Sequence, residues 1–134
     1  MLRVRDLPNS LRFYRELFDA PPTVEKPDYA KWMLDDPRIN FSIAPADGTR
    51  PPGVAHLGLQ AESAEELEVL RDRIDRAGGT VHNEGETTCC YANSDKTWVV
   101  DGQGVAWEAF FTHGEATTYH GDSASGEKCC AVAG

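Results

Sequence analysis

Residues 54–63 read Val-Ala-His-Leu-Gly-Leu-Gln-Ala-Glu-Ser, and the rest of the chain is organised around them. The segment is typical of a short apolar strand that runs into a helix cap, and the strand carries a histidine, His56. A second apolar run, Val-Ala-Trp-Glu-Ala-Phe-Phe at residues 105–111, carries Glu108. Because an unpaired carboxylate is costly to bury, Glu108 needs a partner. We therefore predict that His56 and Glu108 share a metal ion.

The composition is that of an acidic globular protein. The chain has 134 residues, of which 40% are hydrophobic and 26% charged, as expected for one soluble domain with its own core. Its net charge of −9 argues against binding to nucleic acid or anionic membranes, because both require clustered lysines and arginines. No apolar run reaches the ~18 residues of a membrane span, and the first residues lack a signal-peptide pattern. We therefore expect a cytoplasmic protein.

The chain before residue 54 predicts a strand, a helix and three further strands. Residues 2–5 alternate in hydrophobicity, as in a half-buried strand. Asp6 then caps a helix that has Pro8 in its first turn, and two prolines after residue 20 end it. Strand-like runs follow at residues 23–26, 29–34 and 39–44, before a turn-rich linker at 45–53.

The chain after residue 54 predicts the same order of elements. Ser63 and Glu66 form a capping box, and Gly78 closes the helix that they begin. The inward face of this helix is aliphatic, with Leu67, Leu70 and Ile74. Three strands are then predicted, at residues 80–83, from 90–92 into 97–100, and at 105–111.

The repeated order of elements indicates an internal duplication. Alignment of the two caps, Asp6 with Ser63, gives an offset of 63 − 6 = 57, under which Leu2 falls on Leu59. We predict an α+β fold with one domain at residues 1–113, built from two βαβββ modules at 1–50 and 53–113. The small and polar residues 114–134 are predicted to form a flexible C-terminal tail.

The four cysteines form two adjacent pairs, Cys89-Cys90 and Cys129-Cys130. Neither pair has the Cys-x-x-Cys spacing of a zinc site or a redox motif. Adjacent thiols suit thiophilic ions such as zinc, cadmium or trivalent arsenic. Neighbouring residues of a strand point to opposite faces, so both sulfurs reach one atom only from a loop or bulge. Residues 84–86, Glu-Gly-Glu, permit a bulge just before the first pair.

Several motifs resemble those of the vicinal-oxygen-chelate superfamily, which contains glyoxalases, bleomycin- and fosfomycin-resistance proteins and extradiol dioxygenases. They are Val-Arg-Asp-Leu at 4–7 with Ser-Leu-Arg-Phe-Tyr at 10–14, His-Leu-Gly-Leu at 56–59, and Asp101-Gly102 ahead of Trp107-Glu108. The resemblance implies two βαβββ modules that form a curled mixed sheet around a metal cleft. The first strand of this chain is then truncated relative to the superfamily pattern.

Within that superfamily, the chain is similar to the organoarsenical carbon–arsenic lyases and cadmium-induced proteins. The motifs are Tyr-Ala-Lys-Trp at 29–32, Thr-Thr-Cys-Cys-Tyr-Ala at 87–92, Asp-Lys-Thr-Trp-Val at 95–99 and Gly-Glu-Ala-Thr at 114–117. The resemblance implies an Fe(II)-dependent, dioxygenase-type enzyme that uses O₂ to cleave trivalent organoarsenicals and releases arsenite. Other divalent metals, such as Ni, Co, Zn or Cd, fit the same site, and the superfamily includes monomers and homodimers.

The same resemblance assigns roles to particular residues. His56 and Glu108 are the metal ligands and catalytic residues. Substrate binding falls to four residues, Cys89, Cys90, Tyr91 and Lys96. Cys129 and Cys130 are accessory thiols.

One ligand of the expected metal triad is missing from the numbered chain. The counterpart of His56 falls at 56 − 57 = −1, two positions before Met1. His82 is a poor substitute, because it belongs to a different strand. We therefore expect metal binding by this chain to be weakened or absent, which titration with Fe(II) or Zn(II) would test.

Two other functions fit the same sequence. The first is a metalloenzyme of the glyoxalase or fosfomycin-resistance type, whose activity would survive replacement of Cys89 and Cys90 by serine. The second is a protein that sequesters cadmium or arsenite through thiols without turnover. Soft-metal binding by such a protein would be unchanged in His56→Ala.

Overall fold

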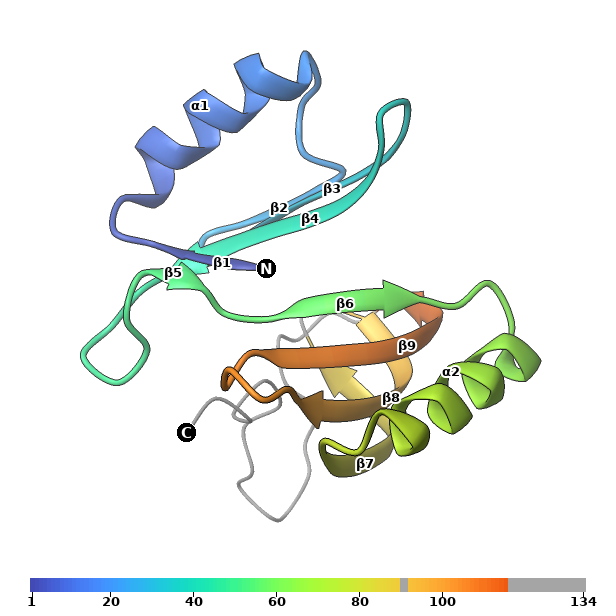
Figure 1. Cartoon of the computed structure of the whole chain (residues 1–134). Coiled ribbons are helices and arrows are strands. Elements are labelled where there is room, and N and C mark those ends of the chain that lie inside the picture. Colours follow the sequence, from blue (N-terminus) through green and yellow to red (C-terminus); the bar gives the residue numbers. More distant parts are fainter. Residues whose placement is uncertain (90–91, 116–134) are drawn as a thin grey trace. The chain divides into compact units, whose positions relative to one another are not determined.

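The computed structural model describes residues 1–89 and 92–115, which contain two helices and nine strands (Figure 1). In chain order the elements are β1 Leu2–Val4, α1 Leu7–Phe18, β2 Val24–Lys26, β3 Tyr29–Asp35, β4 Arg38–Pro45, β5 Gly53–Val54, β6 Leu57–Gln60, α2 Ala64–Ala77, β7 Thr80–Cys89, β8 Ala92–Val100 and β9 Ala106–Glu115. The chain divides into two units between Ala55 and His56. The predicted α+β class and the repeated βαβββ order are confirmed.

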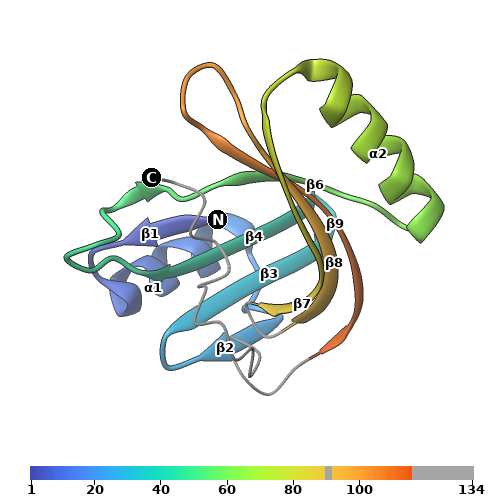
Figure 2. The same ribbon diagram turned by 90° about the horizontal axis from the view of Figure 1, so that it is seen from below.

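The sheets of the two units have corresponding strand arrangements. The first sheet has the order β2-β3-β4-β1-β5, of which Figure 2 labels the first four strands, and the second has the order β6-β9-β8-β7. In both, the first strand of the module runs parallel to the last. Leu2 pairs with Ile43 and Leu59 pairs with Ala109, so the offset between the last strands is 109 − 43 = 66. The duplication inferred from the order of elements is therefore present in the strand pairing as well.

Helix α1 begins at a side-chain cap and ends at a left-handed residue. The backbone N–H of Asn9 donates to Asp6 Oδ1 at 2.8 Å, and Asp19 at the other end has φ 49°. The helix covers one face of its sheet through aromatic rings whose neighbouring centroids lie 4.6–6.1 Å apart, namely Tyr14, Phe18, Trp32 and Phe41. The core of the first unit therefore combines this aromatic cluster with aliphatic side chains such as Leu7, Ala30 and Ile43.

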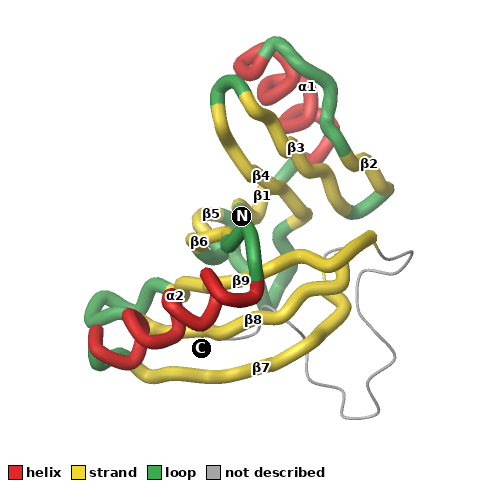
Figure 3. Tube along the Cα trace, turned by 90° about the vertical axis from the view of Figure 1, so that its right-hand side faces the viewer, coloured by secondary structure: helices red, strands yellow, loops and turns green. Residues whose placement is uncertain are grey.

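Helix α2 has the predicted N-cap, except that the Glu66 carboxylate accepts from a different backbone N–H than in a capping box. The N–H of Glu66 donates to Ser63 Oγ at 3.1 Å, as in a capping box. The Glu66 carboxylate accepts from the N–H of Glu62 at 2.7 Å. The helix lies along the second sheet (Figure 3), and the buried residues between them are aliphatic: Ala61, Leu67, Leu70, Ile74 and Ala109. Neither α1 nor α2, the helices of the described residues, is long and apolar enough to cross a membrane.

The segment predicted as one strand at residues 54–60 divides between the two sheets. Val54 pairs with Leu2 in the first sheet, whereas residues 57–60 pair with β9 in the second. His56 lies between these two short strands, and Leu57 and Leu59 are exposed rather than buried. The apolar pattern failed here because it records hydrophobicity and does not show where the backbone changes its hydrogen-bond partner.

Strands β7 and β9 are longer than predicted. β7 continues from residue 80 to Cys89, with a register shift between Asn83 and Gly85 at the place where the sequence permitted a bulge. β9 continues to Glu115, two residues into the predicted tail. The extra length comes from backbone pairing with β8, which side-chain alternation does not reveal. The rest of the predicted tail lies outside the described residues.

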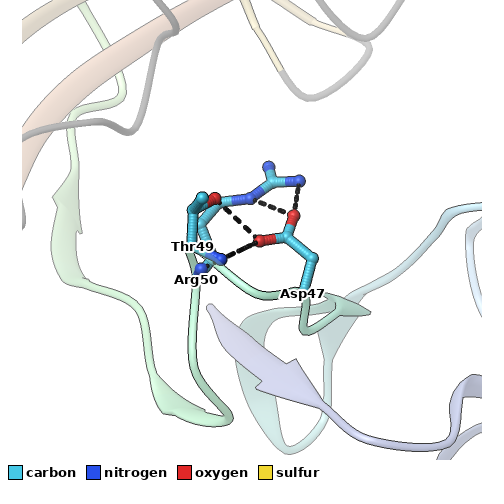
Figure 4. Close-up of polar contacts among 3 residues, drawn as sticks. All are labelled: Asp47, Thr49 and Arg50. Carbon is cyan, nitrogen blue, oxygen red and sulfur yellow. Dashed lines mark hydrogen bonds and ion pairs between the residues drawn. The ribbon is translucent and has the colours of Figure 1, made fainter.

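The linker before β5 contains a turn that is organised by Asp47 (Figure 4). Asp47 Oδ1 accepts from the backbone N–H groups of Thr49 at 2.9 Å and Arg50 at 2.8 Å, and Oδ2 accepts from Arg50 Nε at 2.7 Å. The Arg50 side chain, together with these N–H groups, lowers the pKa of Asp47 below its usual range. The predicted turn is thus held by one carboxylate.

Candidate metal-binding site

His56 is the first residue of the second unit, and its imidazole is buried although its neighbour Leu57 is exposed. The ring packs edge-on against the indole of Trp98, with 5.1 Å between the ring centroids. Such a contact between perpendicular rings is favourable and restricts the imidazole. His56 is therefore positioned before any ligand binds.

Glu108 is accommodated by a glycine on the adjacent strand. Glu108 in β9 pairs with Gly58 in β6, so both residues lie on the same face of the sheet. A Cβ atom at Gly58 would lie 2.7 Å from Glu108 Cγ, which is closer than carbon atoms approach without displacement. Gly58 therefore provides the space through which the glutamate side chain turns toward His56.

The carboxylate of Glu108 lies between two nitrogen groups. Its Oε1 is 3.3 Å from His56 Nε2 and its Oε2 is 3.4 Å from Lys96 Nζ, and all three side chains are at most 11% exposed. Burial by itself raises the pKa of Glu108. The hydrogen bond from His56 and the positive charge of Lys96 outweigh burial and lower this pKa to about 2. The carboxylate is consequently ionised at neutral pH and ready to bind a cation.

Trp98 forms a wall of the same site. It is the direct cross-strand partner of Glu108 in the β8–β9 pairing, so the two side chains lie on one face. The Lys96 ammonium lies 5.9 Å from the centroid of the indole. Buried Trp98 therefore restricts solvent around both His56 and Lys96.

The donor atoms suit a divalent metal. Imidazole nitrogen and carboxylate oxygen are ligands of iron, manganese and zinc. Glu108 Oε2 is buried, and among the described residues it accepts no hydrogen bond. Within residues 1–89 and 92–115, no three His, Cys, Asp or Glu side chains gather as a metal site. His56 and Glu108 are thus two fitting ligands in this part of the chain.

His82 does not join this pair. It is exposed on β7 and pairs with Trp98 of β8, so a whole strand separates it from Glu108 on β9. Two strand spacings place the backbones of β7 and β9 roughly 10 Å apart. The low ranking of His82 as a substitute ligand agrees with this arrangement.

The cysteines predicted to bind substrate lie largely outside the described residues. β7 ends at Cys89, whose backbone pairs with Ala92 at the start of β8. Cys90, Tyr91, Cys129 and Cys130 are not among the described residues. Their roles stay predictions. Lys96, the fourth predicted substrate-binding residue, is the one that the structure brings to Glu108.

Arg71 supports the site from the opposite face of the sheet. Its Nε donates to Thr97 Oγ1 at 2.7 Å and its guanidinium donates to Asp95 Oδ1 at 2.7 Å. These two residues flank Lys96 on β8, and alternation along the strand directs Lys96 to the other face. Burial lowers the pKa of Arg71, but Glu68 and Asp95 outweigh burial and raise it. Arg71 thereby attaches α2 to the strand that carries Lys96 and Trp98.

From the sequence, no role in the site was assigned to Gly58, Arg71 or Trp98. The contact of Gly58 depends on the register between β6 and β9, and that of Arg71 depends on how α2 lies over β8. A His-Leu-Gly motif could have suggested the glycine, since a glycine inside a strand often marks close approach of a neighbouring side chain. Nothing in the sequence marks Arg71 beyond its ion pair with Glu68.

The chain has relatives of known family. Residues 1–109 match the sequence profile of the glyoxalase/bleomycin resistance protein/dioxygenase superfamily. A trivalent organoarsenical cleaving enzyme from Bacillus sp. (strain MD1) is 40% identical over 130 residues, which cover 96% of this chain and 79% of that protein. The cadmium-induced protein CadI of Mycobacterium tuberculosis (strain H37Rv) is 33% identical over 136 residues, covering 96% of this chain and 89% of that protein.

A solved structure has the same fold. The Mn(II)-bound glyoxalase from Novosphingobium aromaticivorans matches with a TM-score of 0.64 at 18% sequence identity. The match covers 92% of this chain and 40% of that chain. At this identity the similarity concerns the fold alone.

Proposed function

Because the chain belongs to the glyoxalase/bleomycin resistance protein/dioxygenase superfamily, we propose that it is an enzyme that cleaves the carbon–arsenic bond of trivalent organoarsenicals and releases inorganic arsenite. The 40% identity to an organoarsenical cleaving enzyme supports this substrate class. The observation that carries the proposal is the buried contact of 3.3 Å between His56 Nε2 and Glu108 Oε1. Buried imidazole and carboxylate in contact form a ligand pair of the kind that such chemistry requires.

The proposed cofactor is Fe(II), with O₂ as the second substrate. His56 Nε2 and Glu108 Oε1 would hold the metal, which would replace the hydrogen bond that now links these atoms. When bound, iron supplies the redox chemistry with O₂ that the protein side chains cannot perform. The protein contributes a carboxylate that is ionised before the metal arrives, because Lys96 stabilises its charge.

The other residues position the substrate and exclude water. Cys89 and Cys90 are proposed to hold trivalent arsenic, since two thiolates are its preferred soft ligands. Trp98 keeps bulk solvent from His56 and Lys96, so that the charges of the site act in a low dielectric. Holding the arsenical beside the metal would lower the entropic cost of the reaction.

Aerobic incubation with methylarsenite, Fe(II) and a reductant tests the proposal. We expect inorganic arsenite to appear, as measured by chromatography with arsenic detection. His56→Ala and Glu108→Gln should each slow its release on the order of 100-fold or more. Ser42→Ala is the matched control, because Ser42 occupies the position of Glu108 in the first module (108 − 66 = 42).

Two outcomes would contradict the proposal in different ways. Methylarsenite that is bound and never demethylated would favour a protein that sequesters the arsenical without turnover. Arsenite release that persists after Cys89 and Cys90 are changed to serine would favour an enzyme that does not hold arsenic through thiols. Zinc titration of His56→Ala, compared with the unaltered chain, tests the metal ligands independently of turnover.

A further inference from the structure

The two fully buried tryptophans differ in the state of their indole N–H groups. Trp32 is 0% exposed and Trp98 is 1% exposed. Trp32 Nε1 donates to the backbone carbonyl of Ala20 at 3.0 Å. Trp98 Nε1 has no hydrogen-bond partner among the described residues. Because an unsatisfied buried donor destabilises a fold, the N–H of Trp98 requires an explanation.

The second unsatisfied atom is an acceptor in the residue beside it. Glu108 Oε2 and Trp98 Nε1 are the two buried side-chain polar atoms without a hydrogen-bond partner in the part of the chain that the structure describes. Trp98 and Glu108 are direct cross-strand partners in β8 and β9, so their side chains are neighbours on one face. Neighbouring side chains therefore carry an indole N–H without a hydrogen bond and a carboxylate oxygen that faces the Lys96 ammonium but accepts no hydrogen bond.

A hydroxyl group can use both atoms, because it accepts one hydrogen bond and donates another. An anionic oxygen would face the carboxylate of Glu108 without a proton to donate. Lys96 does not offset this repulsion, since its ammonium is already 3.4 Å from Glu108 Oε2. The charge at this point thus favours a neutral hydroxyl over an oxyanion.

We propose that Trp98 Nε1 and Glu108 Oε2 together bind a hydroxyl group of the ligand. The indole N–H donates to the hydroxyl oxygen, and the hydroxyl proton is donated to the carboxylate. This subsite rests on the proposed function, under which the ligand at this point is the product, inorganic arsenite, whose arsenic keeps one hydroxyl when the two proposed thiols replace the other two hydroxyls as water. Trp98 is then a specificity-determining residue for arsenic that carries oxygen.

Titration of ¹⁵N-tryptophan-labelled, metal-free protein with inorganic arsenite tests the subsite without any turnover. The three indole N–H signals are assigned with single Trp→Phe variants. We expect the Trp98 signal to shift saturably toward the hydrogen-bonded range. The signals of Trp32 and Trp107 should stay in place, since these N–H groups already face Ala20 O and Asp101 Oδ2. A Trp98 signal that does not move at saturating arsenite would overturn the proposal.

The variants Trp98→Phe and Trp32→Phe give a second, matched test. Both remove the same atoms from a fully buried position, but only Trp32 loses a satisfied hydrogen bond. Trp98→Phe should bind arsenite about ten-fold more weakly than the unaltered protein. Its urea midpoint of unfolding should be at least as high as that of Trp32→Phe. Unchanged arsenite affinity in Trp98→Phe would contradict the subsite.

The two proposals can fail separately. A Trp98 signal that responds to arsenite in a protein that never demethylates methylarsenite would refute the enzyme function and keep the subsite. Demethylation with an unresponsive Trp98 signal would do the reverse.

Discussion

The two βαβββ modules have the same strand order but differ in what their sheets carry. In the second module, Glu108 lies beside Gly58 and faces His56 and Lys96. In the first, the position equivalent to Glu108 is Ser42. The comparison shows that backbone pairing fixes the topology of both copies, whereas three buried side chains in one copy create the candidate site.

The helices are also attached to their sheets by different chemistry. In the first unit, Tyr14 packs against Phe41 with ring centroids 4.6 Å apart. The helical offset of 57 places Arg71 at the corresponding position of α2 (71 − 57 = 14), where it binds Asp95 and Thr97. One helix is thus attached by aromatic contacts and the other by an aliphatic core with a charged clamp.

The largest expected effect concerns the difference between Glu108 and Ser42. Glu108→Gln removes a proposed metal ligand, and we expect arsenite release to fall on the order of 100-fold or more. Ser42→Ala should change the rate by less than about two-fold, because it touches no proposed ligand. Comparable losses in the two variants, measured as initial rates at saturating Fe(II), would mean that the modules share the chemistry.

Helix attachment should respond to salt in only one unit. Tyr14→Ala should lower the free energy of unfolding by about 3 kcal/mol through lost ring contacts. Arg71→Ala should lower it by about 2 kcal/mol, because Asp95 loses its ion pair and the buried Thr97 hydroxyl loses its donor. Urea unfolding with and without about 1 M NaCl measures both effects, because salt at this concentration screens interactions between exposed charges. Only the cost of Arg71→Ala should shrink in salt.

The pH dependence of stability should report the ionised state of Glu108. Its pKa is lowered from 4.5 to about 2 in the folded protein. The ionised carboxylate therefore contributes fully to the free energy of unfolding above the pKa of the unfolded chain, and this contribution is lost as pH falls toward the pKa of the folded protein. As pH falls from the unfolded to the folded pKa, the free energy of unfolding of the metal-free protein should drop on the order of 2 kcal/mol more than that of Glu108→Gln. Urea titrations in the presence of a chelator measure this difference. Parallel pH curves for the two proteins would contradict the charge assignment.

The smallest effect is expected where the modules are alike. Asp6 and Ser63 each accept a backbone N–H at the start of their helix, at 2.8 Å and 3.1 Å. Asp6→Ala and Ser63→Ala should therefore each cost about 1 kcal/mol of stability, as measured by urea unfolding. A much larger cost for one of them would show that the two helix starts are not equivalent after duplication.

Local patterns were sufficient for the elements and for the two central residues of the site. Asp6 and Ser63 marked both helix starts because a cap is decided by residues three positions apart. His56 and Glu108 were recognised because each is a polar group among apolar neighbours, and they do lie 3.3 Å apart. The sequence could not show that Val54 and Leu57 pair in different sheets.

The amino-acid sequence by itself determined the α+β class, the duplicated order of elements and the pairing of His56 with Glu108. Only the tertiary structure decided that Gly58 makes room for the carboxylate, that Arg71 holds the strand behind Lys96, and that the indole of Trp98 stands opposite Glu108 without a partner. Caps and strand periodicity depend on neighbours within a few residues along the chain. Register and the satisfaction of buried donors depend on which distant strand lies alongside, and folding alone settles that.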